Sequence, residues 1–176
     1  MNQPVELLPE PDEAAKKRSR DLSACIIAAC EQQGGSIAFR DFMQMALYQP
    51  GMGYYSGGLE KFGETGDFIT APEISSLFSQ CVARQLAQLN RDAGLVDVLE
   101  FGAGSGVMAA DVLLEMERLQ ASPGHYYIVE LSSELRERQK RTIKQRAPHL
   151  TASVHWLDAL PDKPIQAVIL ANEVLD

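Results

Sequence analysis

The chain has 176 residues, of which 45% are apolar and 23% are charged, a composition typical of a globular protein with one sizeable core. Its formal net charge of −8 argues against non-specific binding to nucleic acid, because Lys and Arg must neutralise the phosphates. The sequence has no apolar run of about 18 residues, so we expect no membrane-spanning helix.

The cysteines and the N-terminal residues indicate a location. Cys25, Cys30 and Cys81 are odd in number and lack the spacing of metal ligands, which predicts a reducing compartment and no metal site. Residues 1–11 are acidic and contain prolines, unlike a signal or transit peptide, and are predicted to form a disordered tail. The simplest interpretation is a cytoplasmic, bacterial protein.

Helical periodicity and capping residues predict an N-terminal helical and loop region over residues 12–94. Asp12 can cap the first helix, and Gly34 with Gly35 ends it. The glycine-rich stretch 54–71 has no periodicity, and its length favours an ordered loop with a function. Pro72 suits the first turn of a further helix. The predicted helices cover residues 13–33, 39–48 and 72–91.

Apolar strands alternate with helices over residues 95–176. The strands are predicted at 95–101, 125–131, 152–156 and 167–171, with helices at 106–120 and 133–146. This alternation predicts an α/β fold, with a parallel sheet, helices on both faces and a ligand site at the carboxyl ends of the strands. Three crossovers cannot cover a large sheet. We therefore expect a sheet that is incomplete at its C-terminal end, with the fourth strand an exposed apolar edge.

A glycine-rich turn directly follows the first predicted strand. Gly102, Gly104 and Gly106 let a ligand approach bare backbone and the N–H groups that begin the next helix. Glu100 precedes this turn by two residues, and Glu130 ends the second strand, where a carboxylate can accept hydrogen bonds from ribose hydroxyls. These residues together predict a site for an adenosine-containing cofactor. A glycine turn that binds nothing is the alternative.

Two features favour S-adenosylmethionine over a dinucleotide. The dinucleotide fingerprint G-x-G-x-x-G needs its third glycine at Val107, one residue after Gly106. A carboxylate at Glu100 would also repel a pyrophosphate, whereas it suits the ammonium group of S-adenosylmethionine. A nicotinamide-dependent dehydrogenase is therefore the least favoured enzyme.

Several segments match one family in order along the chain. They are residues 39–43, 46–48, 53–55, 66–75, 100–106, 127–130 and 171–176. The chain resembles the MidA-like family of class I S-adenosylmethionine-dependent methyltransferases, which have a Rossmann-like fold, and residues 66–75 are the most specific match. The resemblance implies that this chain is an N-terminal fragment of a member, whose sheet continues to seven strands. Its mitochondrial branch consists of assembly factors of respiratory complex I, which implies arginine methylation of a protein, with a complex I subunit as a candidate partner.

The candidate cofactor-binding residues combine the glycine turn with the ends of the following strands. Leu131 and Asp158 lie where class I methyltransferases often contact adenine, although a core leucine and a solvated acid explain them equally well. The set is Glu100, Gly102, Ala103, Gly104, Gly106, Glu130, Leu131 and Asp158.

The candidate catalytic residues are Glu173, Asn172 and Asp67. Glu173 and Asn172 follow the fourth strand, where many class I enzymes hold the target nitrogen, and a carboxylate there could orient a guanidinium by paired hydrogen bonds. A helix cap is the alternative. The resemblance places Asp67 in a loop that closes over cofactor or substrate. Thr70 and Glu73 are expected to form a capping pair.

The favoured function is a methyltransferase that uses S-adenosylmethionine to modify a protein. A non-catalytic assembly factor that retains the cofactor site is one alternative, and a methyltransferase for a small molecule or RNA is another, with the acidic charge disfavouring RNA. An unfinished sheet predicts that this fragment is marginally stable or self-associating, and leaves open whether it is active alone. The methyl acceptor, the symmetry of any arginine methylation and the oligomeric state stay open.

Overall fold

The structure is a computed structural model, and it describes residues 10–57, 69–94 and 97–174. The chain divides after Gly57 into two compact units, each described by itself. The predicted tail (apart from residues 10 and 11), Asp67 and most of the predicted loop lie outside the described residues. No helix in the described ranges is both long and apolar enough to cross a membrane.

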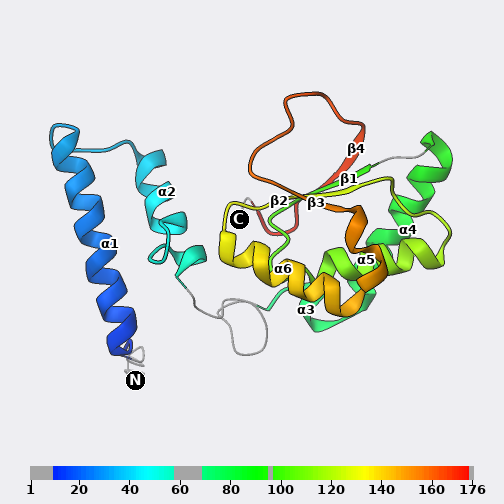
Figure 1. Cartoon of the computed structure of the whole chain (residues 1–176), viewed down its shortest axis with the longest axis horizontal. Helices are drawn as coiled ribbons and strands as arrows, with labels where there is room; N and C mark the ends of the chain where they lie inside the picture. Colours follow the sequence, from blue (N-terminus) through cyan, green and yellow to red (C-terminus); the bar gives the residue numbers. More distant parts are fainter. Residues whose placement is uncertain (1–9, 58–68, 95–96, 175–176) are drawn as a thin grey trace, which may run out of the picture. The chain divides into compact units, whose positions relative to one another are not determined.

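The first unit contains two α-helices, whose predicted limits are confirmed to within a residue, and a short 3₁₀ helix within the stretch predicted as a loop. Helix α1 (Glu13–Gln32) begins at Asp12, whose side chain accepts a hydrogen bond of 2.6 Å from the Ala15 N–H. Helix α2 (Phe39–Tyr48) follows, and then the short 3₁₀ helix η1 (Tyr54–Ser56) (Figure 1). The Tyr55 ring stacks on Tyr48 with 5.6 Å between centroids, so it packs within this unit.

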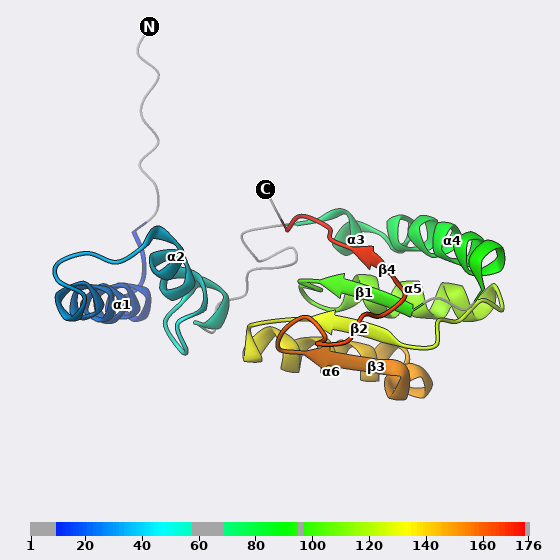
Figure 2. The ribbon, with the colours of Figure 1, turned by 90° about the horizontal axis from the view of Figure 1, so that it is seen from above.

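The second unit contains a parallel sheet with the strand order β3-β2-β1-β4. The strands are β1 (Asp97–Phe101), β2 (Tyr126–Val129), β3 (Val154–Leu157) and β4 (Ala167–Leu170). Figure 2 shows the four strands side by side. The short helix η2 (Pro148–Ser153) occupies the start of the predicted third strand, which therefore begins two residues later. The parallel sheet of the predicted α/β fold is confirmed.

The helices of this unit lie along one face of the sheet. Helices α4 (Ser76–Ala93), α5 (Val107–Arg118) and α6 (Ser133–Arg146) lie on the same side, whereas residues 158–166 cross the opposite side (Figure 1). Right-handed crossovers explain this difference from the expected helices on both faces. The steps from β1 to β2 and from β2 to β3 run in one direction, and the step to β4 runs back past β1.

Apolar side chains from the sheet and three helices form the core between these layers. Val98 and Ile128 point from the strands toward the helices and are fully buried. They pack with Leu86 of α4, Met116 of α5 and Ile143 of α6. Alternate residues of each strand face the helices, as the period of a β-strand requires. The strand residues Glu100 and Tyr126 lie on this same buried face.

The single helix predicted over residues 72–91 is wrong, because the chain breaks at Ser75. Helix α3 (Ala71–Ile74) ends there, and Ser75 has extended backbone angles of −158° and 142°. Its side chain accepts a hydrogen bond of 3.1 Å from the Leu77 N–H and so starts α4 as a cap. Helix α4 packs on α5, so residues 71–94 group with the sheet. The division therefore lies after Gly57 rather than after residue 94.

Candidate functional site

The loop between β1 and α5 has a backbone that needs glycine at three positions. Gly102, Gly104 and Gly106 have φ angles of 61°, 53° and 84°, in the left-handed region that L side chains rarely adopt. Among the described residues, a methyl group placed on Gly102 would come within 4 Å only of the Val174 Cγ2 atom, at 3.8 Å. As far as the described part of the chain shows, the loop therefore leaves its backbone open beside Gly102. Ala103, between the first two glycines, is buried.

Gly106 has a second reason to lack a side chain. A methyl group at this position would lie 2.9 Å from the Cα atom of Gln139 on α6. The glycine therefore allows α6 to approach the start of α5, where Gly106 is the cap residue. Contact between Gly106 and a cofactor stays a prediction, since this packing alone accounts for the residue.

Glu100 carries a buried carboxyl group directly before the glycine loop. Its side chain is 2% exposed, and Oε2 accepts a hydrogen bond of 2.8 Å from the Tyr126 hydroxyl. Burial raises the pKa of Glu100 from 4.5 to about 7, opposed by the Tyr126 hydrogen bond and increased by the nearby Glu130 charge. The carboxyl is thus close to half ionised at neutral pH, and a bound cation would favour its ionised form.

Glu130 directly follows β2, which pairs with β1 in a register that places Ile128 opposite Glu100. The charge of Glu130 is nevertheless close enough to act on Glu100. The Glu130 side chain is 5% exposed. The Oε1 atom accepts a hydrogen bond of 2.9 Å from the Ser132 N–H, and Oε2 accepts one of 2.8 Å from Gln139 Nε2. Burial raises the pKa of Glu130, and these hydrogen bonds partly oppose the shift. A carboxylate has about four acceptor positions, so it can still accept hydrogen bonds from a ligand.

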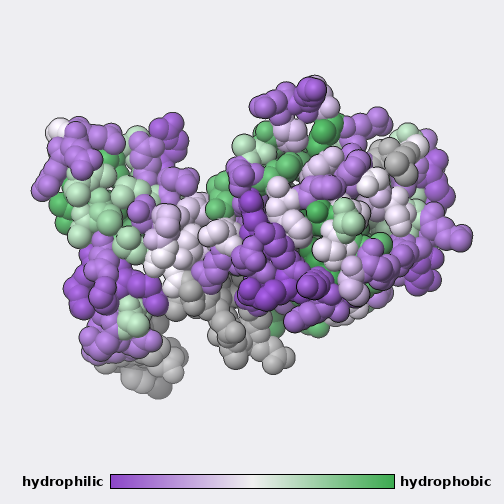
Figure 3. Space-filling view, in the orientation of Figure 1, coloured by the Kyte–Doolittle hydropathy of each residue, from purple (hydrophilic) through white to green (hydrophobic). Residues whose placement is uncertain are grey.

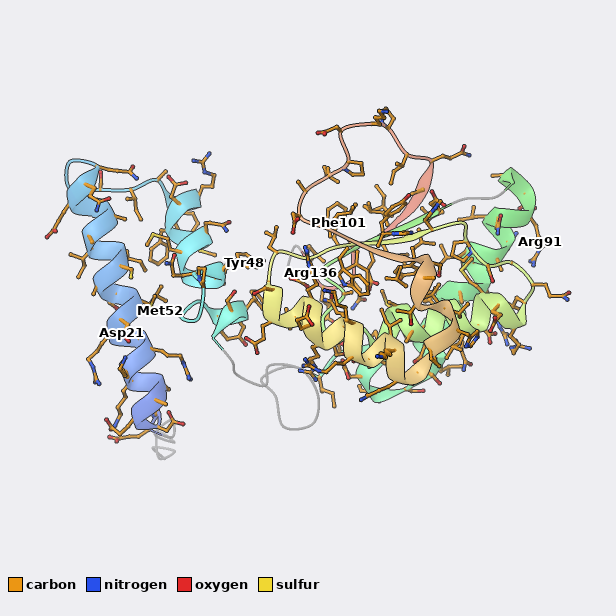
Figure 4. All side chains as sticks on the ribbon, viewed as in Figure 1. Asp21, Tyr48, Met52, Arg91, Phe101 and Arg136 are labelled. Carbon is orange, nitrogen blue, oxygen red and sulfur yellow. The ribbon has the colours of Figure 1, made fainter. Side chains whose placement is uncertain are left out.

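Arg136 links the ends of β2 and β3. Its guanidinium donates to the backbone carbonyls of Glu130, at 2.9 Å, and Leu157, at 3.3 Å, and projects from α6 toward these strand ends (Figure 4). It also pairs with Asp158 at 2.6 Å, although the Asp158 side chain is 90% exposed. An adenine contact from Asp158 therefore stays a prediction. Leu131 is 54% exposed, so the core alternative for this leucine is wrong.

Helix α3 reaches the glycine loop through one hydrogen bond. The Ser105 hydroxyl donates a hydrogen bond to the Glu73 carboxylate. It also accepts a hydrogen bond of 3.3 Å from the Val107 N–H at the start of α5. The predicted capping pair of Thr70 and Glu73 is wrong: Thr70 is the cap residue, but its side chain makes no capping hydrogen bond. Glu73 instead accepts a hydrogen bond from the Ser105 hydroxyl.

Asn172 and Glu173 lie two and three residues after the end of β4, which pairs with β1. The nearby Val174 approaches Gly102, so the structure places this loop beside the glycine loop. Glu173 has a positive φ of 51°, which is unusual for a residue with a side chain, and it is exposed. A catalytic role for Asn172 and Glu173 stays a prediction.

Sequence reasoning missed three residues that organise this site, namely Tyr126, Arg136 and Gln139. In the sequence, Arg136 belongs to a basic run typical of a solvated helix face, and Figure 3 does show hydrophilic side chains gathered over α6. A signal for Gln139 existed. Leu135 and Ile143 are buried four residues before and after it, so a polar residue sits on the apolar face of the helix.

Comparison with known proteins identifies relatives of this chain. A family described as "Putative S-adenosyl-L-methionine-dependent methyltransferase" matches residues 77–176. A protein from Burkholderia thailandensis, solved with S-adenosyl-homocysteine bound, is 46% identical with a TM-score of 0.86, over 97% of this chain and 45% of that chain. "Protein arginine methyltransferase NDUFAF7, mitochondrial" from Danio rerio is 32% identical over 89% of this chain and 41% of its own length. The Drosophila melanogaster homologue of that protein is 32% identical over 81% of this chain and 37% of its own length.

The sheet order, the glycine loop and the structural neighbour together define a class I, Rossmann-like methyltransferase fold. The chain belongs to the S-adenosyl-L-methionine-dependent methyltransferase family whose model it matches over its C-terminal 100 residues, 77–176. It spans less than half the length of these three relatives.

Proposed function

We propose that this protein binds S-adenosylmethionine and transfers its methyl group to a protein. The observation that carries the proposal is the pair of buried carboxyls, Glu100 and Glu130, at the ends of adjacent parallel strands beside an open glycine loop. Family membership and the neighbour that binds S-adenosyl-homocysteine support it.

Each residue of the site then has a separate task. The ionised Glu100 carboxylate attracts the ammonium group of the cofactor, and Gly102 with Gly104 admits its methionine end. Glu130 accepts hydrogen bonds from the ribose hydroxyls. S-adenosylmethionine supplies an electrophilic methyl group when bound, so the residues around it mainly position the acceptor and exclude water.

For the acceptor we propose the guanidinium group of a protein arginine. Relatives at 32% identity are named protein arginine methyltransferases, which supports this substrate class. Glu173 and Asn172 follow β4 beside the glycine loop, where a carboxylate can pair with a guanidinium. Asp67, outside the described residues, is proposed to assist from the preceding loop. A respiratory complex I subunit, the partner that the family resemblance implies, is the first protein to test, and a cytoplasmic location fits the free cysteines.

Calorimetric titration tests the cofactor. We expect saturable binding of S-adenosylmethionine and none of NAD. The Glu130→Gln variant should bind at least about tenfold more weakly, because the amide accepts fewer hydrogen bonds. Glu137→Gln is the control, since it makes the same change at an exposed carboxylate of α6 that is outside the candidate cofactor-binding residues. A folded wild-type protein that ignores S-adenosylmethionine contradicts the proposal.

The pH dependence of the same titration tests Glu100. Its carboxyl has a pKa of about 7 and must be ionised to attract an ammonium group. The affinity for S-adenosylmethionine should therefore rise about tenfold between about pH 6 and pH 8. Glu100→Gln should bind weakly and without this rise. A wild-type affinity that is flat over this range would mean that Glu100 does not hold the cation.

Transfer of a labelled methyl group tests the acceptor. We expect label on arginine residues of proteins mixed with the enzyme, and about a hundredfold less with Glu173→Gln at unchanged cofactor affinity. Glu134→Gln on α6 serves as the control substitution. Label that enters only small molecules would support the alternative of a small-molecule methyltransferase.

A further inference from the structure

Gln139 is a polar residue in a position that should be apolar. It lies on α6 between the buried Leu135 and Ile143, and it is 0% exposed. A buried amide costs free energy unless its donors and acceptor are all paired. The contacts of Gln139 show how this cost is met.

The Gln139 side chain makes hydrogen bonds with three segments that belong to different strands or follow them. Nε2 donates to the Gly104 carbonyl at 3.1 Å, in the loop after β1, and to Glu130 Oε2 at 2.8 Å, at the end of β2. The Oε1 atom accepts a hydrogen bond of 2.9 Å from Nε1 of Trp156, which lies in β3. Both N–H groups and the carbonyl are thus paired, as a buried amide requires.

Trp156 determines which way the amide faces. An indole N–H can only donate, so the atom that meets it must be the amide oxygen. The NH₂ group then faces Glu130 and Gly104, which offer only acceptors. The backbone is held as well, because Gly106 leaves no room between the loop and the Gln139 Cα atom. The orientation of Gln139 is therefore fixed from two sides.

We infer that Gln139 is a positioning residue, which holds the Glu130 carboxylate and the Gly104 carbonyl in the geometry that binds the cofactor. Gln139 occupies one acceptor position of Glu130 Oε2, the Ser132 N–H occupies one of Oε1, and the Leu131 N–H also donates to this carboxylate. A carboxylate has about four acceptor positions, so one is left for a ribose hydroxyl. The inference rests on the proposed function, since it assigns Glu130 to the cofactor.

Gln139→Glu tests the inference with little change in size. The carboxylate can still accept from Trp156, but it cannot donate to Glu130 or Gly104. Gln139 contacts the Glu130 carboxyl directly, and the charges of Glu100 and Arg136 interact with Glu130. Lys140 Nζ lies 5.7 Å from the centre of the Trp156 ring, which donates to Gln139. Two adjacent carboxyls cannot both ionise easily, so acid conditions would return one donor to the pair. We expect S-adenosylmethionine to bind to this variant at least about tenfold more weakly than to the wild type at about pH 8, and this deficit relative to the wild type to shrink toward pH 6.

Gln145→Glu is the matched control, because Gln145 is exposed on the same helix. It should match the wild type at both pH values, and urea denaturation should show that each variant is folded. If Gln139→Glu does not fold, Trp156→Phe replaces it, since it frees the amide while keeping Gln139. That variant should lose severalfold affinity.

The outcomes separate the two proposals. If the wild type binds S-adenosylmethionine and folded Gln139→Glu binds within twofold of it at both pH values, Gln139 only supports the fold and the inference is overturned. Unchanged affinity in Trp156→Phe would overturn it as well. If the folded wild type does not bind, the proposed function fails, and this inference fails with it.

Discussion

At the scale of single residues, the site is defined by groups that are costly to bury. Glu100 and Glu130 are each at most 5% exposed, and burial raises the pKa of both. Burying a carboxyl without a cation costs stability, which a protein tolerates mainly where function requires the group. The cost supports a ligand-binding role, because it has no benefit for folding.

The buried Glu100 carboxyl makes stability depend on pH. Its pKa is about 7 in the folded protein and 4.5 as its ordinary value, so the folded state binds the proton more tightly. This favourable contribution is complete below about pH 4.5 and is lost as the pH rises through 7, at a cost of about 3 kcal/mol. Urea denaturation at about pH 5 and pH 8 should show this loss, and Glu100→Gln should remove most of it. Equal pH dependence in the variant would contradict the assignment.

Gly106→Ala should destabilise the protein more than Gly102→Ala. Both glycines have positive φ angles, which cost an alanine about 1–2 kcal/mol. Only at Gly106 does the added methyl group collide with backbone, 2.9 Å from the Gln139 Cα atom. We expect a loss of about 3 kcal/mol or more for Gly106→Ala, measured by urea denaturation. Equal losses in the two variants would show that the approach of α6 to this loop is not tight.

At the scale of elements, the break between α3 and α4 connects the region before the sheet to the candidate site. The extended Ser75 ends α3, which leaves Glu73 free to accept a hydrogen bond from Ser105 in the glycine loop. Ser105 also accepts from the Val107 N–H at the start of α5. Because of this break, α3 supports the glycine loop through Glu73. In a continuous helix over residues 71–93, Glu73 would not be directed at Ser105.

Ser75→Ala should weaken α4 by removing its cap. The Ser75 side chain accepts from the Leu77 N–H at 3.1 Å, and loss of such a cap costs about 1 kcal/mol. Thermal or urea unfolding measures this loss. Ser75→Asp should restore stability, because aspartate caps equally well and its charge favours the start of a helix. Failure of Ser75→Asp to restore stability would mean that the hydroxyl has another task.

At the scale of the whole molecule, β4 is the edge strand of the described sheet on the side of β1. Ile169 in this strand is 63% exposed, and unpaired backbone beside an apolar side chain favours association with another strand. The expectation that the fourth strand forms an exposed apolar edge is therefore confirmed for the described residues. The expected self-association stays a prediction.

Ile169→Lys should reduce self-association of the purified chain. Size-exclusion chromatography with light scattering should show a mass that increases with concentration for the wild type and stays near that of a monomer for the variant. Leu160→Lys is the control, because Leu160 is also 63% exposed but lies in a loop. A wild type that remains monomeric at high concentration would contradict this prediction.

The class of fold and the centre of the candidate site were predictable because their signals are local. The limits of α2 and α6 matched their predicted ranges, and the strands differed by one to three residues where both ends are described. Periodicity and capping residues act over a few positions, so a single sequence carries them. The break at Ser75 was missed, because a serine within a periodic segment fits a helical residue equally well.

The sequence by itself determined the alternation of strands and helices, the glycine-rich turn and the two carboxyls at the strand ends, because backbone sterics and side-chain periodicity specify them locally. Only the tertiary structure decided that Tyr126 bonds to Glu100 and that Gln139 joins Gly104, Glu130 and Trp156. These contacts join residues up to 35 positions apart, and the burial that raises the pKa of Glu100 arises only when the helices cover the sheet.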